Sequence, residues 1–235
     1  MDLARSWNLF YKQFVENNGY TRVLSGLQNT LIIAVLGLVI GIVLGTILAV
    51  TKVIPQKSKT AKTFSRLTDI YVALFRGTPM VVQLLVMYYV LLPLMGINRV
   101  PALTVAVLAF GLNSAAYVCE IMRSGILSVD KGQMEAGRAL GMGYGRTMFK
   151  VIIPQAVKNI LPTLGNEFIS LVKETSVASF ITVVDMTKAF QNIGAANYDY
   201  FLPYIVLALC YLVIVYIITL AVKLIERRMR RSDRK

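Results

Sequence analysis

The chain has 235 residues, of which 56% are hydrophobic, and it carries a formal net charge of +13. Soluble domains are about 45–50% apolar, and most of the basic residues here lie in three short segments between or after uncharged windows, which argues against a nucleic-acid-binding protein. The sequence contains no histidine, so histidine-based catalysis and most zinc chemistry are excluded, and we expect no metal site.

The first 22 residues are largely polar, and the first uncharged window follows them. Either this segment lies along the outer membrane interface as an amphipathic stretch, or it is a plain polar leader. The window Val23–Thr51 is too long for the apolar region of a signal peptide, so we expect it to remain as a transmembrane helix. Its glycines Gly37, Gly41 and Gly45 allow close helix approach and suit a dimer seam.

Two further uncharged windows, Gly77–Asn98 and Val100–Cys119, predict the next transmembrane helices. A helix needs about 20 apolar residues to cross a hydrocarbon core of roughly 30 Å. Gly77-Thr78-Pro79 interrupts the first of these two helices, either as a break that lines a site or as a packing kink.

The segment of about 40 residues that follows, approximately 124–162, is long for a connection and does not resemble a loop. Gln133–Leu140 predicts a short helix that Gly141 ends. A second helical stretch begins at Tyr144, ends or kinks at Pro154, and is followed by further helix as far as Pro162. These short helices predict a protruding element, for which the alternative is a solvated connector.

The last two predicted transmembrane helices are Phe168–Val184 and Phe201–Val222. The first of them is interrupted by Lys173 and Glu174, and charges at this depth persist only where they face protein, water or substrate. The fold class expected is therefore an all-α integral membrane protein with about five transmembrane helices. No internal repeat is evident, and we expect a single domain over residues 23–224.

The basic residues predict which side of the membrane each segment faces. Eighteen of the 25 lysines and arginines fall in residues 52–66, 123–158 and 223–235, and five transmembrane helices put all three segments on one side. The positive-inside tendency assigns that side to the cytoplasm. The N-terminal segment, residues 1–22, then faces outward, and residues 225–235 form a basic cytoplasmic tail.

The protruding segment contains a motif of defined spacing. Glu135-Ala136-Gly137 is followed by Gly141 and then by Val151-Ile152-Ile153-Pro154. This pattern resembles the signature of ABC importer permeases, which is Glu-Ala-Ala, three residues, Gly, nine residues and Ile-x-Leu-Pro. The segments 75–84, 113–120 and 161–168 are similar to the polar-amino-acid branch of that family, and the resemblance covers nearly the whole chain. The departures are Gly137, Val151 and Ile153.

The resemblance implies the type I permease architecture in the bacterial cytoplasmic membrane, and transport inward. In that family the protruding element is a coupling helix that seats on an ATP-hydrolysing subunit. The residues carried over to this contact are Glu135, Ala136, Gly137, Gly141, Val151 and Pro154.

The chain itself has no phosphate-binding loop of the form Gly-x-x-x-x-Gly-Lys-Ser/Thr. We therefore expect a non-catalytic subunit without a cofactor of its own, since ATP and Mg bind a partner dimer of ABC ATPase subunits. The other implied partners are a second permease subunit, identical or similar, and an extracytoplasmic amino-acid-binding protein. A secondary transporter or channel that is not coupled to ATP is the alternative.

Polar residues inside the predicted helices are candidates for substrate contact. They are Gln83, Met87, Asn113, Lys173, Glu174, Thr175 and Ser176. Lys173 would meet the carboxylate of a zwitterionic solute and Glu174 its ammonium group; alternatively, the two satisfy each other or Arg76. Arg76 and Glu120 lie nearer the cytoplasmic ends and form either a structural ion pair or a gate.

The last predicted loop, residues 185–200, faces outward. Its polar residues Asp185, Asn197 and Asp199 meet either a binding protein or only water.

Overall fold

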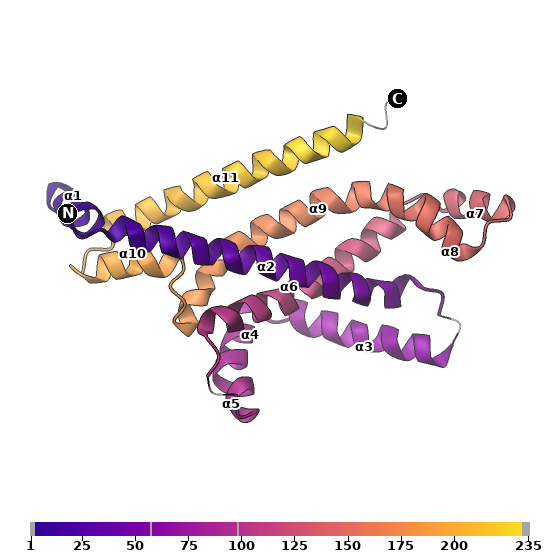
Figure 1. The fold of residues 1–235 in the computed structure, drawn as a ribbon, viewed down its shortest axis with the longest axis horizontal. Coiled ribbons are helices and arrows are strands. Elements are labelled where there is room, and N and C mark those ends of the chain that lie inside the picture. Colours follow the sequence, from indigo (N-terminus) through magenta and orange to yellow (C-terminus); the bar gives the residue numbers. More distant parts are fainter. Residues whose placement is uncertain (1–2, 57, 98, 232–235) are drawn as a thin grey trace.

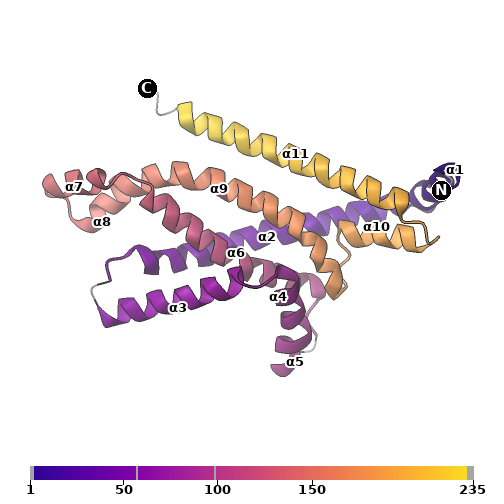
Figure 2. The ribbon, with the colours of Figure 1, turned by 180° about the vertical axis from the view of Figure 1, so that it is seen from behind.

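The computed structural model of the chain is a bundle of long helices, and the residues that it describes (3–56, 58–97 and 99–231) contain no strand (Figure 1). Four helices form the body: α2 (Gly19–Val53), α6 (Ala102–Leu127), α9 (Ile153–Glu174) and α11 (Phe201–Arg231). Figures 1 and 2 show α10 (Met186–Ala195) at the N-terminal end of α2 and α7 (Lys131–Ala139) at the opposite end of the molecule. The all-α expectation is confirmed.

A sharp bend divides the second membrane element. Helix α3 (Lys59–Arg76) and the helical arm that starts with α4 (Met80–Val86) differ in direction by 104°. The arm continues through a π-helical turn, Met87–Leu91, into α5 (Leu92–Leu94). The predicted interruption at Gly77-Thr78-Pro79 is therefore confirmed, and the continuous helical arm Met80–Leu94 falls inside the predicted window of residues 77–98. Charge-free windows missed α3 because its polar face carries lysines and arginines while its other face is apolar.

The start of α3 also differs from the sequence prediction. Residues 59–66, expected in a basic loop, form its first turns, and the Ser58 hydroxyl caps them by accepting a hydrogen bond from the Ala61 amide at 3.1 Å. Ser at this position satisfies an amide that the first turn leaves without a partner. The basic residues of this segment are thus held on a helix rather than on a flexible connection.

In the described part of the chain, α2, α6 and α11 are long and apolar enough to cross a membrane, and the bent α3–α4 pair brings the number to four if it counts as one span. The expected helix over residues 168–184 has other bounds. Helix α9 begins at Ile153, contains Pro162 and ends at Glu174, and a 3₁₀ helix follows over Thr175–Ile181. The count of five transmembrane helices stays a prediction.

The glycines of α2 pack against α6 of the same chain. A Cβ atom at Gly41 would lie 2.6 Å from the Ser114 Oγ, and one at Gly45 would lie 2.7 Å from the Val118 Cβ. Gly37 similarly approaches Phe110, which is fully buried. The suggested dimer seam is therefore wrong: these glycines allow α2 and α6 to approach closely inside one subunit.

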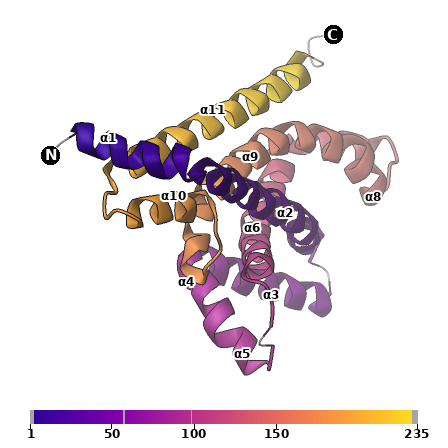
Figure 3. The same ribbon diagram turned by 60° about the vertical axis from the view of Figure 1, so that its left-hand side comes forward.

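The N-terminal segment is helical and docked. Helix α1 (Leu3–Tyr11) lies beside the first turns of α11 (Figure 3), and the Ser6 hydroxyl donates a hydrogen bond to Asp199 at 2.6 Å. The ring of Phe14 stacks on that of Phe190 in α10, with 6.3 Å between centroids. This segment is thus a structured part of the bundle end.

Asp185 has a structural role at the same end. Its side chain is fully buried and accepts hydrogen bonds from the amides of Thr187 (3.0 Å) and Lys188 (2.9 Å), which caps α10. Since the carboxylate is enclosed within the chain, the interpretation that it meets a binding protein or water is wrong.

Candidate functional site

The protruding element has well-defined helix ends. Asp130 caps α7 by accepting a hydrogen bond from the Gly132 amide at 2.7 Å. At the other end the Met142 amide donates to the Gly137 carbonyl (3.1 Å) and the Gly141 amide to the Arg138 carbonyl (3.0 Å). Gly141 has a φ of +78°, the left-handed conformation that this type of helix end requires and that glycine adopts without strain. The predicted short helix and its end at Gly141 are confirmed.

Gly137 makes close packing within this element possible. A Cβ atom at this position would lie 2.5 Å from the Thr147 Cγ2 in α8 (Tyr144–Thr147), and Thr147 is fully buried. An alanine would therefore push the two short helices apart. The contact gives a physical reason why glycine stands where the resembled motif has its second alanine.

The second helical stretch continues past Pro154. After α8 comes a π-helical turn, Met148–Ile152, which contains Val151, and α9 begins directly afterwards. Pro154 is the second residue of α9, and the helix runs into it without a break because Ile152 before it has helical backbone angles. Pro154 thus does not end the stretch, although its ring removes one backbone hydrogen bond next to the π-helical turn.

The tip of the element exposes large apolar side chains. Leu140 is 82% exposed and Phe149 is 73% exposed, while Glu135 lies exposed on the same element. The Tyr144 hydroxyl donates to the Val53 carbonyl at the end of α2 (3.3 Å), and partial burial raises the pKa of this phenol. The element is therefore attached to the bundle, while its apolar tip is left uncovered by the residues that the structure describes, as expected of a docking surface.

Two of the predicted polar residues, Gln83 and Asn113, lie at the break before α4. The Gln83 amide nitrogen donates to the carbonyl oxygens of Phe75 (2.7 Å) and Thr78 (3.0 Å). Asn113 of α6 in turn donates to the Gln83 side-chain oxygen at 2.9 Å. A proline at position 79 cannot supply the backbone donor that a continuous helix would provide. Gln83 and Asn113 thus satisfy the broken backbone.

A cavity of about 240 Å³ lies beside this break. Gln83 and Met87 line it together with Leu74, Phe75, Thr78, Val82, Val86, Leu91 and Ala109. Its walls are almost wholly apolar, and the Gln83 amide hydrogens are engaged by the backbone. The cavity therefore offers little to a zwitterion, and Asn113 does not line it.

We expect Gln83→Leu to destabilise the protein rather than to change what it transports. The substitution leaves the Phe75 and Thr78 carbonyls without their donor, and unsatisfied buried groups cost about 1–3 kcal/mol each. Thermal unfolding of the detergent-purified protein should show a lower midpoint. Val82→Leu, on an exposed neighbouring position, serves as the control; equal midpoints for the two variants would contradict this role.

Arg76 and Glu120 lie close together, as expected. Arg76 Nη1 is 3.9 Å from Glu120 Oε2, but Arg123 Nη2 is closer, at 2.9 Å from the same oxygen. The Arg76 guanidinium also stacks over the Tyr117 ring, 5.4 Å from its centroid. Glu120 is thus shared between two arginines at the junction of α3 and α6. Whether the pair opens and closes as a gate stays a prediction.

The polar residues 173–176 lie at the end of α9, where the sequence prediction had placed them near the middle of a helix. Thr175 is fully buried and donates to the Val172 carbonyl at 2.7 Å, so it is not accessible to a solute. Ser176 is half-buried. Lys173 and Glu174 are exposed, and neither forms an ion pair with the other or with Arg76 in the part of the chain that the structure describes.

One polar contact inside the bundle was missed by the sequence analysis. The half-buried Glu167 of α9 accepts a hydrogen bond from the Ser114 hydroxyl of α6 at 3.0 Å. A signal for it exists, because Glu167 lies seven residues before Glu174 and therefore near the same face of a helix. An acidic side chain at this depth is a candidate for contact with an ammonium group.

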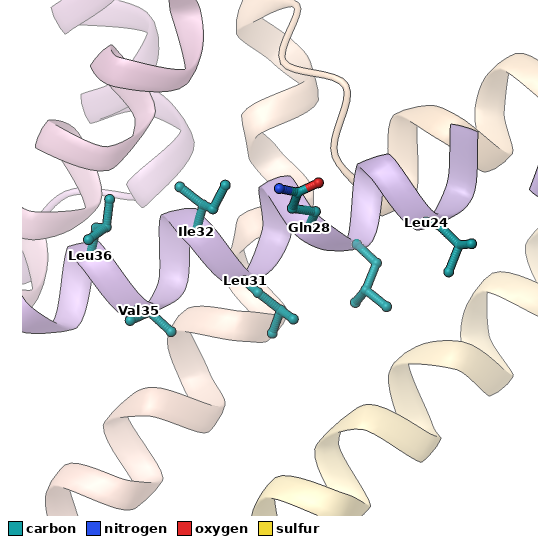
Figure 4. A pocket seen from close by; sticks show the side chains of 7 residues that line it. Leu24, Gln28, Leu31, Ile32, Val35 and Leu36 are labelled. Carbon is teal, nitrogen blue, oxygen red and sulfur yellow. The ribbon is translucent and has the colours of Figure 1, made fainter. Parts of the chain in front are cut away.

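A larger groove, of about 510 Å³, runs along the outside of α2 (Figure 4). It is lined by Leu24, Leu27, Gln28, Leu31, Ile32, Val35 and Leu36. All these residues belong to one helix, and Gln28 is the one polar side chain among them. The groove thus has no converging polar groups, and none of the predicted site residues lies in it.

The sequence matches a protein family described as "Binding-protein-dependent transport system inner membrane component" over residues 37–231. It is 42% identical to the arginine transport system permease protein ArtQ of Bacillus subtilis, covering 90% of this chain and 94% of that protein. It is 38% identical to the putative glutamine transport system permease protein GlnP of Rickettsia bellii, covering 88% and 92%. The L-cystine transport system permease protein TcyB of Bacillus subtilis is 46% identical over 69% of each chain.

The fold also occurs in solved structures of transporters. A crystal structure described as an amino acid ABC transporter with histidines matches with a TM-score of 0.83 and 42% identity, over 92% of this chain and 98% of that one. An inward-facing structure of the MetNI methionine ABC transporter matches with a TM-score of 0.70, covering 92% and 97%. At 21% identity the second match concerns the fold alone.

Proposed function

The chain belongs to the binding-protein-dependent transport system inner membrane component family, and we propose that it carries a polar amino acid inward through alternating access driven by separate ATPase subunits. It is a multi-pass inner-membrane protein and the permease subunit of an amino-acid ABC importer. Its relatives are named for arginine, glutamine and L-cystine. These solutes share an α-ammonium and an α-carboxylate group, which is the chemistry that the pathway has to accommodate.

The protruding element supports the proposal that the chain binds an ATPase partner. Its helices are fixed by a cap, a glycine turn and a contact with α2, yet its apolar tip at Leu140 and Phe149 is exposed. Such a surface is stable in water when another protein covers it. We assign Glu135, Ala136, Gly137, Gly141, Val151 and Pro154, together with the apolar tip, to the coupling contact with an ABC ATPase dimer.

The orientation of the chain in the membrane determines which end meets each of the remaining partners. We place α7 and the basic C-terminal tail in the cytoplasm and the N-terminal helix α1 outside, in agreement with the distribution of basic residues. The end that holds α1 and α10 then receives solute from an extracytoplasmic amino-acid-binding protein. A second permease subunit, identical or similar, completes the pathway.

The direct test is uptake by the complex in liposomes with ATP enclosed. The chain is produced together with its partner subunits, and uptake of labelled arginine, glutamine and cystine is measured with unlabelled amino acids as competitors. We expect uptake that requires both ATP and the binding protein. Uptake of equal rate without any ATPase subunit would instead favour a secondary transporter or channel.

We expect Glu174→Gln to change solute selectivity more than assembly. Glu174 is exposed at the end of α9 and has no ion-pair partner in the described chain, so its charge is available to a cationic group. Losing the charge should weaken competition by cationic amino acids relative to neutral ones by about tenfold, which corresponds to about 1.4 kcal/mol. Glu226→Gln, on the cytoplasmic tail side of α11, is the comparison variant. Unchanged uptake kinetics in Glu174→Gln would remove this residue from the pathway.

A further inference from the structure

A row of polar side chains runs along helix α9. Asn159, Thr163, Asn166, Ser170 and Lys173 follow one another at intervals of four, three, four and three residues. At 3.6 residues per turn, this spacing places all five on one narrow face of the helix. We call these five residues the α9 polar stripe.

The other faces of α9 are engaged by neighbouring helices. Gly165 packs against Val222 of α11, while Ile160 lies against Gly125 of α6. Ala156, Leu164 and Leu171 of the same helix are buried. The polar stripe occupies a remaining face, and four of its five members are exposed, Ser170 being half-buried.

Three of the five stripe residues have no side-chain partner in the described part of the chain. Asn166, Ser170 and Lys173 form no hydrogen bond or ion pair through their side chains in the described residues, and Asn166 and Lys173 are exposed. At the cytoplasmic end Asn159 donates to the Ser128 hydroxyl at 2.8 Å, and Thr163 donates to the Asn159 carbonyl at 3.3 Å. The side chains of Asn166, Ser170 and Lys173 therefore remain available for contacts outside the described chain.

Helix α9 lies at membrane depth. It packs along α6 and α11, which are both long and apolar enough to cross the bilayer, and Figures 1 and 2 show it running beside them. From Asn159 to Lys173 the stripe spans roughly 21 Å, at about 1.5 Å per residue. The polar residues of the stripe lower the mean hydropathy of α9, which is why α9 is less apolar than the potential membrane-spanning helices α2, α6 and α11.

We propose that the α9 polar stripe lines a water-filled pathway through which the amino acid crosses the membrane. Side-chain amides, hydroxyls and an ammonium group are costly against lipid tails, and a polar face inside the membrane is stable next to water or another polar surface. A continuous row of small polar groups offers successive weak hydrogen bonds to a zwitterion. Lys173 stands at the far end from the coupling element, where it attracts the solute carboxylate.

The proposal rests on the proposed function for the identity of the solute, but water access is measured independently of transport. Cys119 and Cys210 are first replaced by alanine, and single cysteines are introduced at Thr163, Asn166 or Ser170 of the full chain, produced with its partner subunits in membrane vesicles. Modification by a charged, membrane-impermeant thiosulfonate is followed over time. Leu212→Cys and Ile217→Cys provide the comparison positions, because both are exposed (65% and 60%) on the apolar helix α11, which is long and apolar enough to cross a membrane.

We expect the stripe cysteines to react at least about tenfold faster than the α11 cysteines, because thiols in lipid meet neither water nor a charged reagent. A transported amino acid should slow their modification. Reaction no faster than at Leu212→Cys would overturn the proposal. Spontaneous disulfides between two copies, without reaction with the reagent, would likewise overturn it by showing a dry contact between subunits.

Transport variants separate this inference from the proposed function. Asn166→Leu should reduce uptake at least about tenfold, and Asn166→Ser should restore most of it, since a hydroxyl keeps a polar group on the stripe. Absence of ATP-driven uptake in the unmodified protein would refute the proposed function while leaving the labelling result intact. Full uptake by Asn166→Leu together with unreactive stripe cysteines would refute the stripe assignment alone.

Discussion

Replacing both Leu140 and Phe149 by glutamate should reduce ATP-driven uptake to background. The two side chains are 82% and 73% exposed at the tip of the protruding element, so charges there do not disturb the core of the subunit. On docking, however, they would enter an apolar contact, and burying an unpaired charge costs several kcal/mol. The measurements are co-purification of the ATPase subunits on the tagged permease and uptake by the same preparation.

Tyr198→Glu is the matched control for this variant. Tyr198 is 89% exposed, but it lies between α10 and α11, at the opposite end of the bundle. It should retain the ATPase subunits. If the double variant kept both its ATPase subunits and its uptake, the apolar tip would not be the docking surface, and the coupling contact would have to lie elsewhere.

The short helix of the protruding element and its end at Gly141 could be predicted because the signals for a helix end are local. An aspartate before the helix and a glycine after it act through hydrogen bonds to neighbouring amides and carbonyls, as seen at Asp130 and Gly141. The position of Gly137, by contrast, depends on its contact with Thr147 in the next helix. From sequence alone, the same glycine was only a departure from the resembled motif.

The membrane helices were harder to predict, because lipid is not the only surface that they meet. Charge-free windows identify helices such as α2 and α11, whose exposed faces are apolar. They fail for α3 and α9, which carry charges or amides along one face while still packing against the bundle. The polar residues 173–176 were accordingly assigned to the middle of a helix that in fact ends at Glu174.

The partners of buried groups depend on three-dimensional arrangement. Gln83 and Asn113 were selected as substrate candidates because polar residues are rare at that depth, but their amides serve the backbone break at Pro79. Glu167 was passed over although its carboxylate lies inside the bundle beside Ser114. The spacing of residues in the sequence predicts which side chains share one face of a helix. It does not predict which neighbouring residues that face contacts in the folded protein.

Replacing Gly45 by leucine should prevent the subunit from folding, which separates the two interpretations of the α2 glycines. A Cβ atom at this position would lie 2.7 Å from the Val118 Cβ and 2.8 Å from the Ala115 carbonyl oxygen, and backbone cannot move aside as a flexible side chain does. Extra methylene groups in a packed core cost about 1–3 kcal/mol, and a clash with backbone costs more. The measurement is the fraction of protein that remains monodisperse after extraction into mild detergent.

Val43→Leu is the control, since Val43 lies on the same helix and is 55% exposed. It should behave like the unmodified chain. The interpretation of the glycines as a dimer seam makes a different prediction: Gly45→Leu would yield a folded subunit that fails only to associate. A monodisperse, thermally stable monomer of Gly45→Leu would therefore contradict the α2–α6 contact, whereas aggregation on extraction is the result that close packing inside one subunit requires.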